Sequence, residues 1–514
     1  MGKTKQKKGT LWTVLTIVLA VLTVISAVAI PVTSYFSTAI NVTLGAATQK
    51  VIADPNAQIF FWSNYENEED LVAFEKQLCR DIESEGAALL VNRDNTLPLA
   101  AGTKFTPFSQ SSFHLLYGGT GSGQVSADDA VSLKAALEES FGADTVNLDQ
   151  WKFYATCGYA RVNADTTGGN QAQYRINEVP WAKYPDALKK TWSNYGDVAL
   201  VVLARSGGEG ADLPSGLPEL EPYMTDGDYL RLNQDEIDML SNLEQLKKDG
   251  VFKKIVVLLN SSNSLQLDFV DDYGIDAVLW IGDVGMTGIN AVADILAGKV
   301  NPSGRIVDTF LKDNHSAPAM QNLGAYPYTN GADYNVASAQ NNTDPGIKQC
   351  NRDYVVYEEG IYVGYRWFDK QEMEVSYPFG YGLSYTSFEY SNPVVKVGKG
   401  ETVVSVDVKN VGSVAGKEVV QLYVAAPASK LDKPAKELKA FAKTAELKPG
   451  ESQTVSLKLS NSDLASFDEA ANAWVVEEGS YKFLVGSSSR DIRLSADADV
   501  KGSSRKVSAI SFDK

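Results

Sequence analysis

Three uninterrupted apolar runs constrain the fold of this chain more than any other feature. They span Val198–Ala204, Ile255–Leu259 and Ala277–Ile281. A strand that is apolar on both faces must be covered on both faces, as in a parallel sheet between two layers of helices. Between the first two runs, Asn233 and Glu236 form a capping pair at the start of an amphipathic helical pattern. The pattern therefore predicts an α/β sandwich built on a parallel sheet.

Further elements follow from the same kind of pattern. Residues 66–85 have a helical pattern, and Phe113–Tyr117 reads as a strand. We also expect a short helix over Leu265–Val270 and a helix over Ile289–Leu296 that ends at Gly298.

A glycine-rich loop, Gly118–Gly123, precedes a helix for which Ser126 is the expected N-cap. A strand, a glycine loop and a helix in this order suggest nucleotide binding. However, Gln124 stands where the G-x-G-x-x-G pattern needs its third glycine. We therefore expect neither dinucleotide binding at this loop nor a cofactor.

The segment Arg205–Pro214 follows the first apolar run and places Glu209 among three glycines. Glycine lets the backbone turn sharply and approach a ligand closely. Ligands of open α/β sheets bind beyond the carboxyl ends of the strands. From these residues alone, two interpretations stay open: a functional carboxylate on a ligand-binding loop, or a solvated turn that holds a charge.

Aromatic residues recur in the polar and irregular segment 143–196, and the pattern leaves their role undecided. Such residues stack on sugars when they lie in exposed loops, and equally often they pack beneath a loop. The residues are Trp151, Tyr154, Tyr159, Tyr174, Trp181 and Tyr184.

After residue 392 the periodicity changes to alternation. Val404, Val406 and Val408 alternate with polar residues, and Thr454–Leu459 and Tyr481–Val485 do likewise. Short alternating strands over about 100 residues are typical of a β-sandwich. The small polar residues from 496 onward read as a tail.

The overall charge argues against nucleic acid as a partner. The 514 residues have a formal net charge of -17, and 44% of them are hydrophobic. An acidic surface repels phosphate backbones, whereas it is compatible with neutral substrates such as sugars.

Few residues in this chain are suited to metal or triad chemistry. The cysteines Cys79, Cys157 and Cys350 form no C-x-x-C pattern, and they allow one disulfide whose pairing stays open. The two histidines are His114, which we expect in the core, and His315, which we expect in a loop. We therefore expect neither a metal site nor a Ser-His-Asp triad.

The N-terminal region combines a basic tail with an apolar span. The span Leu11–Ile30 contains no charged residue and has about the length that crosses a bilayer as a helix. Four lysines precede it, at positions 3, 5, 7 and 8, which predicts a single-pass anchor in the cell membrane with the bulk of the chain outside the cell. A cleaved signal peptide is the alternative, and it exports the chain as well.

Taken together, several ordered segments resemble glycoside hydrolase family 3, the β-glucosidase family. The resemblance covers residues 80–390, and the sandwich from 392 to 495 resembles the fibronectin-type-III-like domain that accompanies this family. The matching segments are Glu85–Asn92, Leu97–Leu99, Gly118–Gly123, Ser206–Gly210, Gly298–Arg305, Tyr357–Arg366 and Tyr377–Tyr385.

The resemblance implies a site. In this family a glutamate on a loop of the α/β sandwich acts as general acid/base, and Glu209 matches that position. Arg205, Ser206 and Asp212 beside it are the expected substrate-binding residues. The family's nucleophile is an aspartate on a (β/α)₈ barrel of about 250 residues, for which this chain has no room. We therefore expect a reversed-order member that lacks the barrel and is inactive alone.

These expectations give a division into segments and two functions. We expect a tail and transmembrane anchor over 1–45, a stem over 46–80, the α/β sandwich over 81–390, the fibronectin-like domain over 391–496 and a tail over 497–514. The first function is retaining hydrolysis of O-glycosyl bonds, completed by a barrel encoded downstream. The second is a non-catalytic cell-surface protein that binds carbohydrate or a partner.

Overall fold

The computed structural model describes residues 3–37, 63–119, 123–162, 174–208, 213, 228–322, 326–327, 353–354 and 356–507. The chain divides into two units, Met1–Glu68 and Glu69–Lys514, and each is considered by itself.

In its described residues the first unit forms the long helix α1 over Lys3–Tyr35. Its segment Trp12–Ile30 has a mean hydropathy of 2.7 and none of it is buried. By length and composition this segment could cross a membrane, and a signal sequence near an N-terminus has the same properties. The expected apolar helix is thus present.

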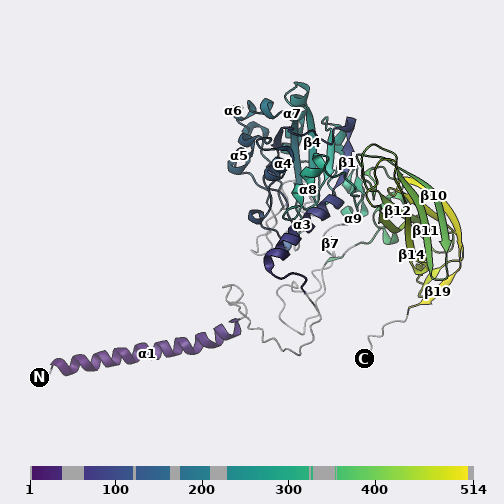
Figure 1. The fold of residues 1–514 in the computed structure, drawn as a ribbon. Coiled ribbons are helices and arrows are strands. Elements are labelled where there is room, and N and C mark those ends of the chain that lie inside the picture. Colours follow the sequence, from purple (N-terminus) through teal and green to yellow (C-terminus); the bar gives the residue numbers. More distant parts are fainter. Residues whose placement is uncertain are drawn as a thin grey trace. The chain divides into compact units, whose positions relative to one another are not determined.

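A five-stranded sheet forms the centre of the second unit (Figure 1). The strand order is β1-β5-β4-β3-β2, and β2 to β5 are parallel. The strand β1 pairs antiparallel with β5, so the sheet is mixed where a parallel sheet was expected. The strands are β1 Ala88–Asn92, β2 Phe105–Phe108, β3 Val198–Arg205, β4 Lys254–Ser261 and β5 Ala277–Trp280.

Helices cover both faces of this sheet. Leu200 and Val202 of β3 belong to a core cluster with residues of α4 and α8, whereas Val201 and Leu203 belong to a second cluster with residues of α7. Figure 1 shows these helices gathered around the sheet. The helices of this part are α3 Glu68–Gly86, α4 Leu133–Phe141, α5 Leu148–Thr156, α6 Asp186–Lys189, α7 Gln234–Lys248 and α8 Gly288–Leu296.

The undecided aromatic residues pack beneath the surface. Tyr154 and Tyr184 are buried, and their hydroxyl oxygens lie 2.7 Å apart. Tyr174 is also buried. The remaining three, Trp151, Tyr159 and Trp181, are partly buried and pack against the two core clusters. These side chains therefore stabilise the fold.

Some local expectations were wrong. Phe113–Tyr117 is not a strand, and the strand in this region is β2, where Pro107 interrupts the apolar pattern. Pro is tolerated there because β2 lies at the sheet edge. Ser126 caps only a 3₁₀ turn, and α4 begins at Leu133. The capping pair of Asn233 and Glu236 is confirmed.

Short elements connect the sheet to the second half of the unit. The expected helix over Leu265–Val270 is a 3₁₀ turn over Asp268–Asp271. The other short elements are β6 Phe310–Leu311, α9 Pro318–Gln321, β7 Tyr326–Pro327, β8 Asp353–Tyr354, α10 Tyr365–Lys370 and β9 Val375–Tyr377.

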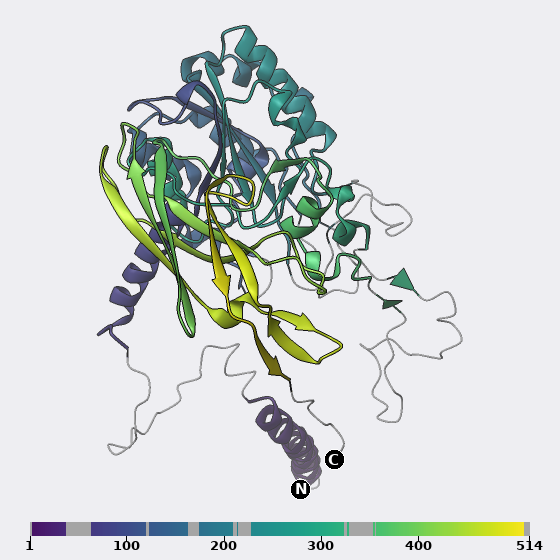
Figure 2. The same cartoon turned by 90° about the vertical axis from the view of Figure 1, so that its right-hand side faces the viewer.

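The C-terminal part is a β-sandwich, as the alternation predicted. Val404, Val406 and Val408 of β11 are fully buried between the sheets, and the residues between them are partly exposed. Figure 2 shows its strands, coloured green to yellow, side by side. The strands are β10 Phe388–Val397, β11 Glu401–Asn410, β12 Val419–Ala425, β13 Glu437–Lys443, β14 Ser452–Ser460, β15 Ser466–Asp468, β16 Ala473–Val476, β17 Gly479–Gly486, β18 Ile492–Val500 and β19 Ser503–Lys506.

The expected tail over 497–514 is corrected by the last two strands. The strand β18 extends to Val500 beside β17, and β19 pairs with β16. The remainder of that segment, from residue 508, lies outside the described residues.

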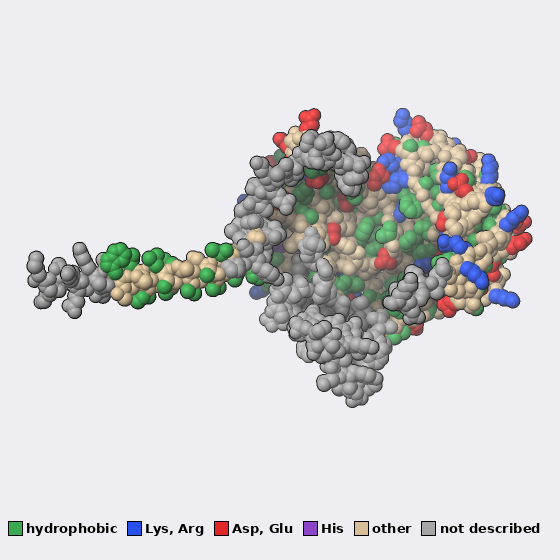
Figure 3. Space-filling view, turned by 90° about the horizontal axis from the view of Figure 1, so that it is seen from below, with side chains coloured by type: hydrophobic (Ala, Val, Ile, Leu, Met, Phe, Trp, Pro, Cys, Tyr) green, Lys and Arg blue, Asp and Glu red, His purple; other side chains and the backbone are tan. Residues whose placement is uncertain are grey.

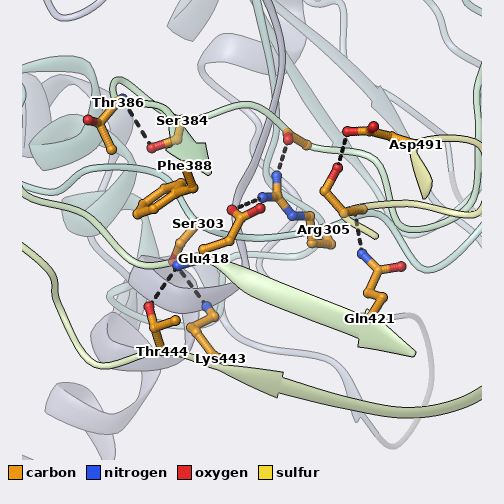
Figure 4. Close-up of polar contacts among 12 residues, drawn as sticks. Ser303, Arg305, Ser384, Thr386, Phe388, Glu418, Gln421, Lys443, Thr444 and Asp491 are labelled. Carbon is orange, nitrogen blue, oxygen red and sulfur yellow. Dashed lines mark hydrogen bonds and ion pairs between the residues drawn. The ribbon is translucent and has the colours of Figure 1, made fainter. Parts of the chain in front are cut away.

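A buried ion pair joins the β-sandwich to the α/β layers (Figure 4). The Arg305 guanidinium lies 2.6 Å from the Glu418 carboxylate, and both side chains are less than one-tenth exposed. Tyr390 donates a hydrogen bond of 2.8 Å to the same carboxylate. Lys443 donates to Ser303 across the interface at 3.0 Å. These contacts fix the chain segment that begins at Ser303 against the β-sandwich.

A second buried carboxyl lies where α3 packs on α8. Glu83 is 8% exposed, and Gly288 approaches it so closely that a Cβ there would lie 3.0 Å from the Glu83 Cβ. Burial, with a smaller contribution from the charge of Asp283, raises the pKa of Glu83 from 4.5 to about 8. Its Oε1 has no hydrogen-bond partner among the described residues. The folded chain therefore holds Glu83 protonated at neutral pH.

We expect Glu418→Ala to lower the free energy of unfolding by about 3–5 kcal/mol, because the variant leaves the Arg305 charge buried without a partner. Urea denaturation measures this. The matched control is Glu401→Ala, which removes an exposed partner 3.9 Å from Lys458 and should cost less than about 1 kcal/mol. Equal losses of unfolding free energy in the two variants would contradict a special role for the buried pair of Arg305 and Glu418.

We expect Glu83→Gln to flatten the dependence of stability on pH. The folded-state pKa lies above the unfolded one, so the folded chain binds the extra proton and wild-type stability falls as pH rises from about 4.5 to about 8. At pH 8 the variant should therefore be more stable than wild type, by roughly a few kcal/mol, and the gain should vanish near pH 4. Thermal unfolding over this pH range is the measurement. Glu75→Gln, at an exposed position on the same helix, should keep the wild-type profile.

Candidate functional site

The candidate site lies on the loops that follow the parallel strands. Gly207 and Gly208 come after β3, Ser262–Ser264 after β4, and Gly282–Gly285 after β5. Because these strands are parallel, their carboxyl ends meet at one edge of the sheet. The loop that contains Glu209 therefore starts from this edge.

Arg205, the last residue of β3, is completely buried and pairs with Glu236 at the start of α7. Its Nη1 and Nη2 lie 2.9 and 2.7 Å from the two Glu236 carboxylate oxygens. The remaining three N–H groups donate to the backbone oxygens of Ala204, Tyr229 and Arg231. All five donors are thus satisfied within the protein.

These contacts anchor both ends of the loop that contains Glu209. Arg205 stands at the start of the loop, and Tyr229 and Arg231 lie where the described chain resumes after it. Ser206 is buried too, and its backbone N–H donates to the Tyr229 hydroxyl at 3.0 Å. The loop thus begins and ends at one fixed point.

Asn263 closes the space beside Gly207. A Cβ on Gly207 would lie 3.2 Å from the Asn263 amide nitrogen, so a larger residue would displace the amide. The same amide donates to the Arg205 backbone oxygen at 3.3 Å. Glycine at this position leaves room for the Asn263 amide.

Asn260, at the end of β4, ties the neighbouring loops together. Its oxygen accepts from the Leu116 N–H at 2.7 Å, and its nitrogen donates to the backbone oxygens of Leu116 and Gly282 at 3.0 and 2.6 Å. Next to it, Ser262 donates to the Asp283 carboxylate at 2.8 Å. Burial raises the pKa of Asp283, which therefore sits in a poorly hydrated place.

A cleft of about 650 Å³ opens beside Gly207 and Gly208. This volume lies within the range of about 300–1,000 Å³ that is usual for small-molecule sites. Figure 3 shows the underside of the structure, which is hollowed and carries hydrophobic side chains together with single acidic ones. The other lining residues are Leu213, Leu230, Ser262, Asn263, Ser264, Asp308, Thr309, Leu311, Asn314, Ala317, Ala319, Met320, Glu359, Val363, Gly364 and Phe368.

The structure describes two of the four predicted site residues. Arg205 and Ser206 lie together at the loop start, with the Arg205 side chain directed into the protein. Glu209 and Asp212 lie outside the described residues. Leu213, which follows them, lines the cleft.

The histidines and cysteines have structural surroundings. His114 is half-buried, and burial lowers its pKa. His315 lies in a 3₁₀ turn over Asn314–Ser316, where a loop was expected, and its Nε2 is 3.0 Å from the Asp228 carboxylate. Cys79 and Cys157 are free thiols, and Cys350 lies outside the described residues. In the described part of the chain, no cluster of three or more His, Cys, Asp or Glu side chains is suited to hold a metal ion.

Sequence reasoning missed three residues of the site: Asn263, Asp283 and Thr309. The first two follow predicted strands at the carboxyl ends of β4 and β5, and that position could have identified them. Thr309 follows no strand of the sheet, and only the tertiary structure brings it to the cleft.

Two family models match the chain. The model of the glycosyl hydrolase family 3 C-terminal domain matches residues 87–365. The model of the fibronectin type III-like domain matches residues 418–489.

Individual proteins agree with these matches. The chain is 34% identical to beta-glucosidase A of Butyrivibrio fibrisolvens over 465 residues, which cover 84% of this chain and 52% of that protein. It is 32% identical to thermostable beta-glucosidase B of Acetivibrio thermocellus, covering 84% and 49%. The structure of beta-glucosidase 3B from Thermotoga neapolitana in complex with glucose superposes with a TM-score of 0.68 at 32% identity, covering 86% and 56%. The chain thus spans about half the length of the curated relatives it matches.

Proposed function

The chain belongs to glycosyl hydrolase family 3 through its C-terminal domain, and from this premise we propose that it takes part in hydrolysing the O-glycosyl bonds of β-glucosides. The observation that carries the proposal is the cleft beside Gly207 and Gly208, directly before Glu209. A glycosidase needs a carboxylic acid that protonates the leaving oxygen. Glu209 is the carboxyl that the chain offers at this place.

We propose that Glu209 is the general acid/base and that Asp212 and Ser206 bind the substrate. Arg205 acts differently, because all its donors are engaged within the protein. It positions the loop by holding both of its ends. Substrate contacts therefore belong to its neighbours.

We further propose that the reaction is retaining and that the nucleophile is an aspartate on a barrel domain outside residues 1–514. A retaining mechanism needs a second carboxylate about 5–5.5 Å from the acid. The coverage of the relatives supports this, because the matched proteins are about twice as long as the matching region. On this proposal, residues 1–514 alone are inactive.

We propose that residues 81–390 form the α/β sandwich domain and that the fibronectin-like domain begins at residue 391. We propose that α1 is a single-pass anchor and that the bulk of the chain lies outside the cell. The uncharged span Trp12–Ile30 and the lysines before it support this.

A second candidate function is a non-catalytic cell-surface protein that binds carbohydrate. It is favoured by one observation: described residues of this chain line a cleft of about 650 Å³. Binding without hydrolysis, even with a barrel supplied, would select it.

We expect the expressed chain to remain in the membrane fraction after alkaline carbonate extraction, because α1 presents an uncharged span of bilayer length. A chain that begins at residue 63 should be released. Recovery of a soluble form that begins after Ala29 or Ala47 would show a cleaved signal sequence instead.

We expect Glu209→Gln to lower kcat on unactivated disaccharides by about 10²–10⁴-fold when a family barrel is supplied by fusion or co-expression. The amide keeps the size and hydrogen bonding of the acid but cannot donate a proton. In Glu209→Ala, azide should restore turnover of activated aryl β-glucosides, because azide needs no general base.

The matched control is Glu219→Gln on the same loop, which should retain activity. If Glu209→Ala keeps nearly full activity on disaccharides, the role passes to Asp212 or Glu219. Hydrolysis that co-purifies with residues 1–514 alone would overturn the proposal of an external nucleophile.

A further inference from the structure

Three side chains lie in one row on the small sheet of β15, β16 and β19, which Figure 1 places at the lower end of the β-sandwich. In the strand register Phe467 is opposite Trp474, and Trp474 is opposite Arg505. Residues directly opposite each other in antiparallel strands point to the same face of a sheet. The two rings touch, with their centroids 5.4 Å apart and an angle of 62° between their planes. These three side chains form the aromatic row.

The aromatic row faces solvent. Phe467 and Trp474 are 41% and 42% exposed, and Arg505 is exposed as well. Ala473, which precedes Trp474 on β16, is buried, so the other face of the strand packs inward. Neighbouring aromatic rings that stay in contact with water are unfavourable until a ligand covers them. Both rings are therefore accessible to a ligand and gain from being covered.

Hydrogen bonds fix the strands that carry the aromatic row. Next to the register of β16 and β19, the Asn472 amide donates to the Val507 backbone oxygen at 3.1 Å, and the Val507 N–H donates to the Asn472 backbone oxygen at 3.0 Å. The Asp468 carboxylate closes the turn between β15 and β16 by accepting from the Ala471 N–H at 3.0 Å. The row is thus preformed, which lowers the entropy cost of binding.

The charge of the β-sandwich differs from that of the whole chain. Residues 391–507 contain 17 Lys and Arg and 15 Asp and Glu, a formal charge of +2, whereas the whole chain has -17. Among the described residues, none forms a hydrogen bond or ion pair with the Arg505 guanidinium. Asp468 is next to Phe467 along β15 and so points to the opposite face, and Glu469 lies in the turn beyond the row. The row therefore offers a free cation beside two rings in the part of the chain that is not acidic.

We infer that the aromatic row binds an acidic polysaccharide, a chain of sugar rings that carry carboxylates. The face of an aromatic ring is electron-rich and attracts the C–H groups of a sugar ring that stacks on it. A guanidinium binds a carboxylate through two parallel hydrogen bonds. A sugar ring on Trp474 brings its carboxylate toward Arg505, the neighbour of Trp474 across the strands. This site goes beyond the proposed function and does not depend on Glu209.

The test compares two sugar hexamers as ligands of detergent-solubilised residues 1–514 by isothermal titration calorimetry. Hexagalacturonate carries a carboxylate on each ring, and cellohexaose has the same number of rings without charge. Hexagalacturonate should bind more tightly. Raising the NaCl concentration from about 0.02 M to about 0.5 M should remove most of the difference, because salt screens exposed charges.

Variants separate the two parts of the aromatic row. Trp474→Ala should weaken hexagalacturonate by about tenfold, because the sugar ring loses its apolar partner. Trp474→Phe keeps a ring and should retain most of the affinity. Arg505→Gln should weaken hexagalacturonate by about twofold to fivefold, the effect of one exposed ion pair, and leave cellohexaose unchanged. The matched control is Phe441→Ala, which removes an exposed ring from β13 on another sheet and should change neither affinity.

Thermal unfolding of each variant accompanies the titrations. Arg505→Gln changes an exposed side chain without a partner, so its unfolding midpoint should equal that of wild type. If Trp474→Ala unfolds, Trp474→Phe and Arg505→Gln decide the matter. Equal affinity for the two hexamers, with no effect of Arg505→Gln, would overturn the acidic ligand. Full affinity in a folded Trp474→Ala, or no binding of hexagalacturonate to wild type, would overturn the site.

Two further measurements test other occupants of the aromatic row. Brominated phosphatidylglycerol, in vesicles that contain the whole chain, quenches tryptophans that reach the bilayer. Less quenching in Trp474→Phe than in wild type would assign the row to the membrane. Self-association of wild type that Trp474→Ala abolishes, measured by sedimentation, would assign the row to a second copy of this chain. Either result would overturn the polysaccharide, and we expect neither.

Discussion

The site depends on the buried ion pair between Arg205 and Glu236. Burial alone would lower the pKa of Arg205, but the charge and hydrogen bonds of Glu236 outweigh it and raise the pKa above its ordinary value. Removing either partner would leave an uncompensated charge in the core, so the two must be retained together. The Glu236 carboxylate also accepts from the backbone N–H of Asn233, the N-cap of α7, so one carboxylate fixes a strand end and a helix start.

The cleft is built from segments with little core of their own. Residues 308–320 and 359–368 form short turns, a two-residue strand and short helices, and they share only a small buried cluster of Leu311, Ala317 and Phe368. Arg305 and Asp369 connect these segments to the β-sandwich through ion pairs. The β-sandwich is therefore a structural part of the site, although none of the described residues that line the cleft belongs to it.

Much of this fold could be predicted from the sequence because its strands are apolar on both faces. The runs beginning at Val198, Ile255 and Ala277 needed no tertiary information, and the helix start at Asn233 followed from capping chemistry. The antiparallel direction of β1 could not be predicted from its residue types, because the strand buries the same side chains in either direction. The strand β18 was missed because small polar residues, serine and aspartate, alternate with alanine along it.

The site was only partly predictable for a related reason. Glycines around a carboxylate mark a loop with unusual freedom, and that identified the segment after β3. The burial of the Thr309 hydroxyl without a hydrogen-bond partner depends on its tertiary surroundings, however. The sequence around Thr309 contains nothing that distinguishes it. Other residues that line the same cleft, such as Phe368, lie far along the chain.

The electrostatics of this sheet edge suit an acid that must hold its proton. Glu178 lies beneath the loop that follows β2 and is almost fully buried. It accepts hydrogen bonds from the Ser109 hydroxyl and the Val179 N–H, which favour the charged form, yet burial dominates and raises its pKa to about 7. Burial likewise raises the pKa of Asp283 against the opposing effect of Ser262. Both carboxyls thus have raised pKa values despite hydrogen bonds that oppose the shift, because burial disfavours the charged form of a carboxyl. On the proposed function, the general acid needs its protonated form when the leaving oxygen departs, and burial at the ends of β2 and β5 is the kind of environment that favours this form.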